Sequence, residues 1–502
     1  MEPETADTKS NVVVSSPTDL SNVQSDEEAP FGYGKEKCDH AGFWDHSMIN
    51  IRLHVLKLWA KTVLILCVFV LLVLAISNGV YSDTPQRLGS LNVYVVNFDA
   101  RLDPYLGNDS LVGEAVVNVA ETIAKSGGPH LGYATMDPSV FNNDPMEVRQ
   151  AVYDFKAYAA IIVNANATAL LRQAVELGNT SYDPDGAGQM IYVSARDQTA
   201  IQAFVVPQLN SFERAVSTHF STSWAQGLLQ NDSVSRSTLE KVPQVLSPAI
   251  GFTAFDLRPF GPSLITPAVS IHLINLIIIA FFSFTFFLKT HMKFTVPRGH
   301  PPLHFHHLIV WRWCATVAAY FLLSLAFSVV VLAYQVPTAN PPASQTEPAM
   351  NPSAYGRGTF VVYWMLNFVG MAALGLACEN VAMALGEPWT AMWIIFWVTM
   401  NVSTAFNSLD LAPRFYQWGY AFPLHNIVEA SHQIFFDLHS RIGRNFGILF
   451  AWAIVNTIVF PFACYLMRWK QVREYKLKQE KKERWLREMA KSRTMLGMAK
   501  EQ

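Results

Sequence analysis

Residues 62–81 read TVLILCVFVLLVLAISNGVY, and ten residues later, at 91–98, the chain continues as LNVYVVNF. The first stretch carries no charge over 20 residues, which is the length that a helix needs to cross about 30 Å of hydrocarbon. It starts too deep in the chain for a cleaved signal peptide, so we expect a signal anchor. The second stretch is rich in β-branched and aromatic residues, as strands are. Together they predict a span followed at once by a folded domain.

The composition of the whole chain supports a membrane protein. Of its 502 residues, 51% are hydrophobic and only 15% are charged, whereas about 25% are charged in ordinary soluble proteins. The formal charge of -2 shows no basic excess, so we expect no nucleic-acid partner. The sequence predicts a membrane α-helical bundle of six transmembrane helices, at 62–82, 266–288, 308–334, 359–385, 389–409 and 446–467.

Basic residues near the span ends predict the orientation, because cytoplasmic loops carry an excess of Lys and Arg. Such residues precede the first span, lie between the second and third, and follow the sixth. With six spans these clusters share the cytoplasmic side, so both termini are expected there. Segment 1–50 holds ten acidic and three basic residues and is predicted to be a disordered tail, whereas 468–502 is a basic tail.

Residues 83–262 are then predicted to form an extracytoplasmic α/β domain inserted between helices 1 and 2. Strands are expected at 91–98, 131–136, 158–163 and 190–194, and helices at 111–124, 145–155, 167–177 and in a long stretch ending near 229. This alternation predicts a parallel sheet with right-handed crossovers. No cysteine falls in the domain, so it must fold without disulfides. Glycosylation sequons begin at Asn108, Asn166, Asn179 and Asn231.

Polar residues inside predicted spans are the first candidates for function, because a charge in hydrocarbon is costly and normally faces a bundle interior or a wet cavity. Glu379 and Asn380 stand in the fourth span, twelve and thirteen residues after Asn367. One interpretation is a polar lining or gate. The other is a hydrogen bond that packs helices, or a glutamate close enough to the span end to be solvated.

The segment 410–445 is too polar to span the bilayer and too apolar for a solvated loop. It predicts a re-entrant or broken pair of short helices on the outer face. Within it, His425, Glu429 and His432 recur at i, i+4 and i+7, so they share one helix face. A metal site there is the weaker interpretation, because one face rarely completes a coordination sphere. A hydrogen-bonded surface is the stronger one, and no metal or cofactor is expected.

Sequence motifs for an energy source or for catalysis are missing. The chain contains no G-x-x-x-x-G-K-[ST] phosphate loop and no G-x-G-x-x-G after a strand. Neither G-x-S-x-G, H-E-x-x-H nor paired C-x-x-C occurs. We therefore expect a protein that is not an enzyme and that has no nucleotide-binding domain of its own.

Two long stretches carry a family resemblance. GTFVVYWMLNFVGMAALGLACENVAMALGEPWTAMWIIFWVTMNVSTAF at 358–406 and LAPRFYQWGYAFPLHNIVEASHQIFFDLHSRIGRNFG at 411–447 closely resemble the fungal nitrosoguanidine-resistance membrane protein family. DLRPFGPSLITPAVSIHLINLIIIAFF at 256–282 looks like an earlier landmark of that family. Its layout is similar to the permease half of type-2 ABC exporters. The resemblance implies resistance to toxic compounds and a link to aminophospholipid distribution, and it carries over no catalytic residue.

Two functions follow as hypotheses. In the first, the chain exports a hydrophobic toxin or lipid, which contacts Glu379, Asn380, Asn401 and the segment that begins at Asp410. In the second, it is a non-transporting scaffold or regulator whose outer domain binds a partner. An intramembrane enzyme is a third and weakest reading. The expected location is the plasma membrane or another secretory-pathway membrane. A separate ATPase and a homo-oligomer are partners that the sequence leaves open.

Overall fold

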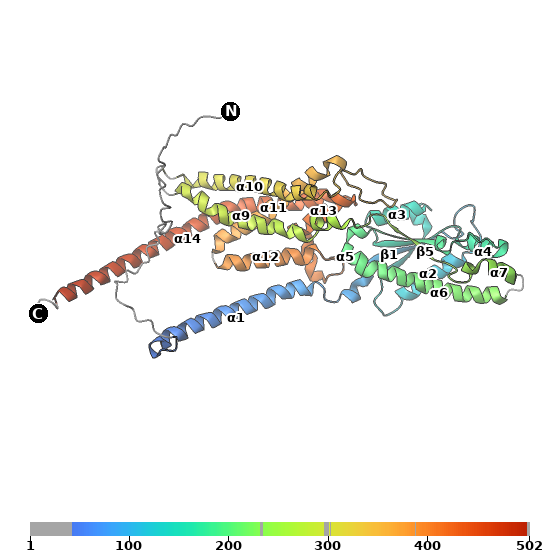
Figure 1. The fold of residues 1–502 in the computed structure, drawn as a ribbon, viewed down its shortest axis with the longest axis horizontal. Helices are drawn as coiled ribbons and strands as arrows, with labels where there is room; N and C mark the ends of the chain where they lie inside the picture. The colour runs from blue at the N-terminus through green and yellow to red at the C-terminus, as the bar shows by residue number, and fades with distance from the viewer. Residues whose placement is uncertain (1–42, 231–233, 296–300, 302, 387, 499–502) are drawn as a thin grey trace, which may run out of the picture. The chain divides into compact units, whose positions relative to one another are not determined.

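The computed structural model describes residues 43–230, 234–295, 301, 303–386 and 388–498 (Figure 1). The chain forms two compact units, residues 1–68 and 69–502, and each is described by itself. The described part of the first unit holds a short 3-10 helix, His46–Met48, and the start of helix α1 (Ile49–Gly79). The side chains of α1 are almost all exposed, as lipid-facing residues of a span would be. Most of the acidic segment predicted to be disordered, residues 1–42, lies outside the described residues.

The second unit contains a five-stranded α/β domain. Its strands are β1 (Asn92–Asn97), β2 (Gly132–Met136), β3 (Ala159–Val163), β4 (Gly188–Tyr192) and β5 (Phe252–Asp256). Its helices are α2 (Leu111–Ala124), α3 (Pro145–Tyr153), α4 (Ala167–Leu177), α5 (Gln198–Ala200), α6 (Val206–Gln230) and α7 (Arg236–Lys241). In the sequence these elements stand between α1 and the helices of the bundle. The predicted bounds of α2 and α4 agree with the structure.

The strand order is β2-β1-β3-β4-β5, and the sheet is mixed. Three neighbouring pairs are parallel, but β3 and β4 are antiparallel, with Val163 opposite Gly188. The prediction of a parallel sheet was wrong at this pair. Gly178 ends α4 in the left-handed conformation (φ 64°), and residues 179–187 lead the chain back to the edge where β3 stops. Strand β5 was not predicted, because its five residues are flanked by Gly and Pro and show little alternation.

Alternate residues of the strands face two different cores. Val93 and Val95 of β1 belong to a cluster with residues of α2, α4 and α6. Val96 of β1 and Ile162 of β3 belong to a second cluster, which includes α3 and continues into the helical bundle. Figure 1 shows α3 on one side of the sheet and α2 and α6 on the other. The domain therefore shares a hydrophobic core with the bundle.

The bundle contains α8 (Thr266–Val269), α9 (Ile274–Met292), α10 (Phe305–Ala333), α11 (Thr359–Leu385), α12 (Trp389–Ala405), α13 (Pro423–Phe436) and α14 (Ile442–Met498). Within the described residues, five helical segments are long and apolar enough to cross a membrane: His46–Gly79, Ser263–Met292, Phe305–Ala333, Gly356–Leu385 and Ile442–Arg487. Helix α12 is 17 residues long, which is about 26 Å and at the lower limit for a span. A sixth span remains a prediction.

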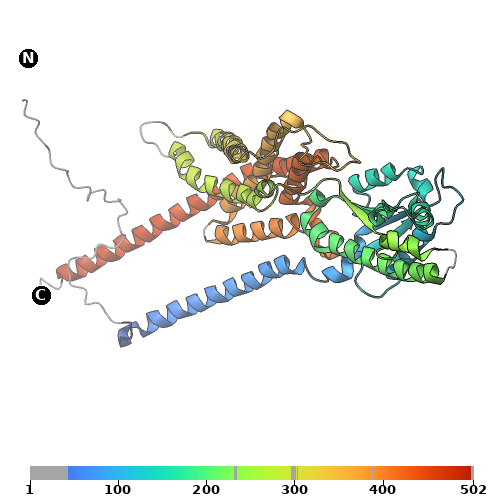
Figure 2. The same ribbon diagram turned by 45° about the vertical axis from the view of Figure 1, so that its right-hand side comes forward.

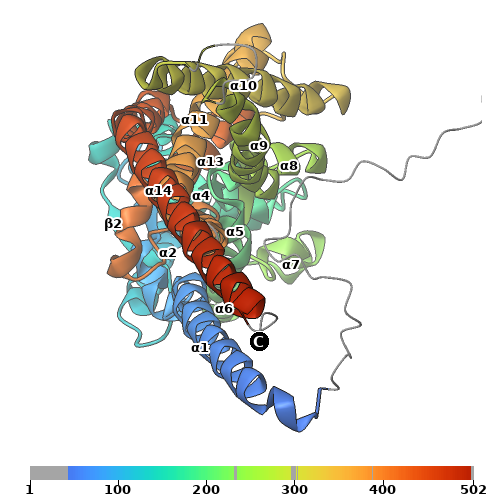
Figure 3. The same ribbon diagram turned by 90° about the vertical axis from the view of Figure 1, so that its left-hand side faces the viewer.

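Helix α11 is the centre of the bundle. It packs against α9, α10, α13 and α14, as Figures 2 and 3 show. Gly375 of α11 allows this close packing, because an added Cβ would lie 2.4 Å from the hydroxyl of Tyr320 and 2.7 Å from the Cβ of Ala280. Most residues of α11 are buried, including its polar ones. Polar side chains of α11 must therefore find partners on neighbouring helices.

The segment 410–445 folds into two short helices, a 3-10 helix at Arg414–Ala421 and α13. Helix α14 then runs for 57 residues, so the predicted sixth span and most of the basic tail form one helix. Pro461 lies inside it.

Arg258 connects the α/β domain to the bundle through hydrogen bonds. Arg258 stands between β5 and α8 in the sequence, and its side chain is fully buried. The guanidinium donates to five backbone carbonyls, those of Leu257, Ala343, Ser344, Glu347 and Asp437. It also lies 3.6 Å from the Asp437 carboxylate. The polar loop between α10 and α11 is thereby tied to both parts of the unit.

Candidate functional site

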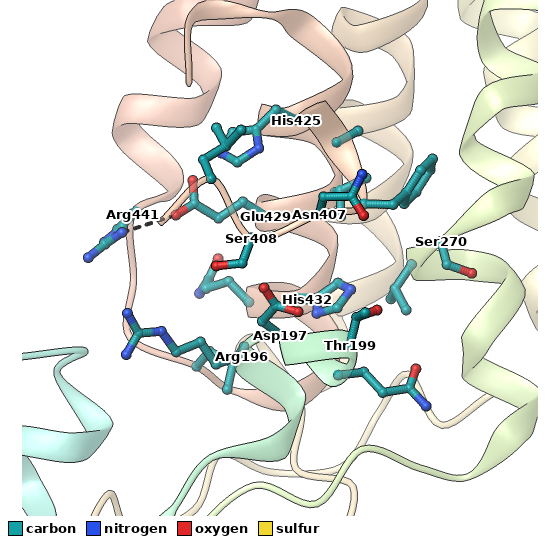
Figure 4. Close-up of a pocket in the computed structure, with 18 of the residues that line it drawn as sticks. Arg196, Asp197, Thr199, Ser270, Asn407, Ser408, His425, Glu429, His432 and Arg441 are labelled. Carbon is teal, nitrogen blue, oxygen red and sulfur yellow. Dashed lines mark hydrogen bonds and ion pairs between the residues drawn. The ribbon is translucent and has the colours of Figure 1, made fainter. Parts of the chain in front are cut away.

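A cavity lies between the α/β domain and the bundle. It has a volume of about 410 Å³. Its walls come from the chain after β4, the start of α9, the end of α12, the segment that follows α12, and α13. Figure 4 labels several of the polar residues that line this space: Arg196, Asp197, Thr199, Ser270, Asn407, Ser408, His425, Glu429, His432 and Arg441. We call it the domain–bundle cavity.

Helix α13 contributes His425, Glu429 and His432 from one face, as their spacing predicted. Nδ1 of His425 lies 3.0 Å from the carbonyl oxygen of Thr404, and Nδ1 of His432 lies 2.8 Å from that of Ala195. Because a carbonyl only accepts, Nδ1 carries the proton in both rings. Burial lowers the pKa of both histidines below the ordinary value. Both rings are therefore neutral near pH 7.

Glu429 supplies the negative charge of this face and is held by two arginines. Its carboxylate lies 3.3 Å from Arg441 and 2.5 Å from Arg444, and these arginines stand just before α14 and in its first turn. All three side chains are partly exposed. The group fixes the carboxylate, and Arg441 itself lines the cavity.

The opposite wall comes from the α/β domain. The Tyr158 hydroxyl donates to the Asp410 carboxylate at 2.5 Å. The Arg196 guanidinium lies over the Tyr158 ring, 3.7 Å from its centroid. The Asp197 carboxylate accepts from the backbone nitrogen of Ala200 at 2.9 Å, and burial raises the pKa of Asp197. The wall thus presents a cation and an acid from the chain after β4 and a phenol from the residue before β3.

The sequence did not single out Arg196, Asp197, Tyr158 or Arg441. One signal could have found the first two, because only Val193 separates β4 from the SARD stretch at 194–197, and residues at strand ends often line sites. Nothing in the spacing of Tyr158 or Arg441 joins either residue to α13. Their place depends on how the domain sits against the bundle within this unit.

Asp410, His425 and Glu429 are brought together at the cavity, but the other four candidates are not. Asn367, Glu379, Asn380 and Asn401 do not line it and are buried in the bundle. Glu379 accepts from Arg312 at 2.7 Å and from Thr316 at 3.2 Å.

The three asparagines have partners of their own. Asn380 donates to the backbone oxygen of Asn456, and Asn367 donates to the Ser328 hydroxyl, each at 2.9 Å. The side-chain oxygen of Asn401 accepts from the backbone nitrogen of Leu424, at the start of α13. These contacts fit the packing interpretation of the intramembrane polar residues.

A second cavity lies at the carboxyl ends of β1 and β3, where α/β sheets commonly bind ligands. Here Asp99, which is 1% exposed, already fills the position between two helix starts. Its carboxylate accepts from the backbone nitrogens of Gly113 in α2 and Thr168 in α4, at 3.1 and 3.0 Å. The Thr168 hydroxyl donates to it at 2.6 Å. Helix starts favour an anion, and the Asp99 carboxylate already occupies this position. We therefore interpret Asp99 as a residue that stabilises the two helix starts.

Three of the four candidate glycosylation residues can be placed. Asn108 and Asn179 are exposed, whereas Asn166 is half-buried at the start of α4, and its sequon threonine is the buried Thr168. Asn231 lies outside the described residues. Across the described part of the chain, no group of three or more His, Cys, Asp or Glu side chains is placed to hold a metal ion.

Comparisons with known proteins agree with a membrane protein. A family described as "Protein of unknown function (DUF3533)" matches residues 62–458. An uncharacterized endoplasmic reticulum membrane protein of Saccharomyces cerevisiae is 28% identical over 333 residues, which cover 64% of this chain and 62% of that protein. No solved structure matches the chain.

Proposed function

The chain belongs to the DUF3533 family of proteins of unknown function, and from this premise we propose that it takes up an amphipathic molecule in the domain–bundle cavity and moves it out of the membrane. The substrate is a hydrophobic toxin or a lipid. The relative is described as an endoplasmic reticulum membrane protein, so we propose a secretory-pathway membrane as the location, with the α/β domain outside the cytoplasm.

One observation carries this proposal: the cavity has a polar wall and an apolar wall. Arg196, Asp197 and Glu429 offer both signs of charge, whereas Ile271, Ile274 and Val402 offer hydrocarbon. Ile271 is 66% exposed and lies just before α9, within the candidate span Ser263–Met292. A molecule with a charged or zwitterionic head and an apolar tail satisfies both walls at once, because each part then keeps a suitable environment.

The position of the cavity supports transport rather than storage. Its lining comes from the start of α9, the end of α12 and the face of α13, so a ligand there touches three bundle helices and the α/β domain together. Movement between these parts would change access to the cavity. The absence of a phosphate-loop motif from the sequence is the reason to propose that a separate ATPase or an ion gradient supplies the energy.

The test is to fill the cavity without removing a contact. Thr199 lines it and is exposed, so Thr199→Trp adds bulk there at little cost to folding. Thr122→Trp makes the same substitution on an exposed turn of α2 and serves as the control. Both variants are expressed in yeast, and tolerance to nitrosoguanidine and outward movement of a fluorescent phosphatidylserine are measured at matched protein abundance.

Thr199→Trp is expected to abolish the nitrosoguanidine tolerance that expression of the protein confers, or to slow the movement of the fluorescent lipid. Thr122→Trp is expected to match the unmodified protein. Equal activity of both variants contradicts transport through this cavity. If tolerance then depends only on the presence of the α/β domain, the scaffold hypothesis replaces transport.

A further inference from the structure

A smaller cavity lies between α10 and α14, away from the domain–bundle cavity, and has a volume of about 240 Å³. Helix α10 lines it with four residues from Phe305 to Arg312, at i, i+3, i+4 and i+7. Helix α14 lines it with five residues from Cys464 to Val472, at i, i+3, i+4, i+7 and i+8. Each helix therefore presents one continuous face to the cavity.

This cavity lies at a membrane boundary. The apolar part of α14 ends at Met467, and Arg468 begins its basic part. Helix α9 lines the domain–bundle cavity with Ile274 and this smaller cavity with Met292. Those 18 residues of helix rise about 27 Å, close to the thickness of the hydrocarbon core. The two cavities thus lie at opposite boundaries of the same bundle.

Two arginines line this smaller cavity. Arg312 and Arg468 line it, and none of its described lining residues is acidic. Arg312 is 1% exposed and pairs with Glu379, yet its Nε is buried with no hydrogen-bond partner. Arg468 is exposed and lies over the Phe305 ring at 4.4 Å. Within the described chain, no acidic residue forms an ion pair with Arg468.

We propose that this cavity binds the phosphate of an anionic phospholipid. Guanidinium groups bind phosphate oxygens through two parallel hydrogen bonds, and the partnerless Nε of Arg312 supplies a buried donor. Leu308, Ile309 and Met467 form an apolar wall for the adjoining chain. Inorganic phosphate shares the headgroup chemistry, but this wall and the boundary position favour a lipid.

The experiment uses the full chain purified in mild detergent, with native mass spectrometry of bound lipid. Phosphatidylserine, phosphatidylcholine and inorganic phosphate are added in separate arms. The unmodified protein is expected to retain one phosphatidylserine in preference to phosphatidylcholine. Arg468→Gln should reduce that retention about fivefold, since one basic residue near a membrane surface contributes about that factor. Arg468→Lys should restore part of it.

Arg473→Gln is the matched control, because Arg473 lies on the same helix beside Trp469 and does not line the cavity. It is expected to retain phosphatidylserine like the unmodified protein. Equal loss in Arg468→Gln and Arg473→Gln, equal retention of both lipids, or binding of inorganic phosphate alone overturns the proposal. Binding is measured without transport, so its failure is distinguishable from failure of the Thr199→Trp test.

Discussion

The carboxylate of Glu379 in α11 lies 2.7 Å from the guanidinium of Arg312 in α10, and both side chains are at most 2% exposed. A charge left alone in such a place is very costly, so the two residues depend on each other. The pair joins the central helix of the bundle to the wall of the smaller cavity. A role for Glu379 in function is therefore inseparable from its role in holding α10 against α11.

Removal of one member of this pair is predicted to destabilise the bundle. Glu379→Gln leaves the Arg312 charge buried and unpaired, which costs about 3–5 kcal/mol. Folded protein should therefore fall in abundance, along with any activity. Thermal unfolding followed by size-exclusion chromatography measures the loss.

The double substitution Glu379→Leu with Arg312→Met provides the control, because replacement of both charges by apolar residues is often neutral. It should recover most of the stability. If Glu379→Gln alone keeps normal stability and loses only activity, Glu379 acts on the substrate path rather than through packing.

Removal of the Arg258 guanidinium is predicted to destabilise the junction between the bundle and the α/β domain. Arg258→Gln leaves most of its five carbonyl partners without a donor, and each buried group left unsatisfied costs about 1–3 kcal/mol. The stability of Arg258→Lys should lie between that of the unmodified chain and that of Arg258→Gln, since an ammonium has fewer donors than a guanidinium. Limited proteolysis of the loop at 337–352 reports the loosening.

Arg236→Gln is the control for Arg258, because the Arg236 side chain is 93% exposed and pairs only along its own helix with Glu240. It should change the unfolding free energy by less than about 0.5 kcal/mol. Cleavage of the loop at equal rates in the unmodified chain and in all three variants contradicts a role for Arg258 in holding the loop.

The sequence predicted elements better than it predicted their partners. The bounds of α2 and α4 follow from periodicity and turn residues, which are local. The antiparallel direction of β4 depends on the path of residues 179–187 in space, and the periodicity of the sequence does not predict that path. The shared face of His425 and Glu429 is likewise local, whereas Tyr158 reaches Asp410 across 252 positions.

One partner could have been predicted. The predicted third span, 308–334, contains Arg312, and the predicted fourth span contains Glu379. A single basic residue in one apolar span and a single acidic residue in another are expected to pair, because each is costly alone in hydrocarbon. That reasoning favours the packing interpretation of Glu379 from the sequence alone.

Asp99 is predicted to stabilise the α/β domain and not to bind a ligand. Asp99→Ala removes the acceptor for three buried donors at the starts of α2 and α4, so we expect a loss of about 2–4 kcal/mol. Thermal unfolding of the full chain measures it. Asp109→Ala, which breaks only an exposed pair with Arg172, should cost less than about 1 kcal/mol. Equal losses in the two variants would contradict the prediction.

The glycosylation sequons test the orientation of the α/β domain. If the domain lies outside the cytoplasm, Asn108 and Asn179 are exposed acceptors, and glycosidase treatment should increase the electrophoretic mobility of the chain. Substitution of each asparagine by Gln should remove one step of that shift. Asn401, which is buried in α12, should contribute none. A chain unaffected by glycosidase would leave this orientation unsupported.

Acidification is predicted to destabilise the wall formed by α13. The pKa values of His425 and His432 are lowered by burial in the folded chain, so below about pH 6.5 the unfolded chain binds more protons than the folded one. Their contribution to stability is complete above that pH and is lost as pH falls toward the folded values. The loss is at most about 1.4 kcal/mol per pH unit for each histidine.

Thermal unfolding between pH 7.5 and 5.5 checks this slope in the unmodified chain and in a His425→Asn, His432→Asn variant. Asparagine keeps a donor near Nδ1 but does not titrate, so the variant should show a flatter pH dependence. Asp197 faces His432, and its raised pKa acts in the opposite direction, because a folded chain that holds a proton more tightly gains stability as pH falls. Comparison with the variant therefore isolates the histidines. His219→Asn, on the exposed face of α6, should leave the slope unchanged, and a slope equal in all three proteins would show that folding does not lower the pKa of either cavity histidine.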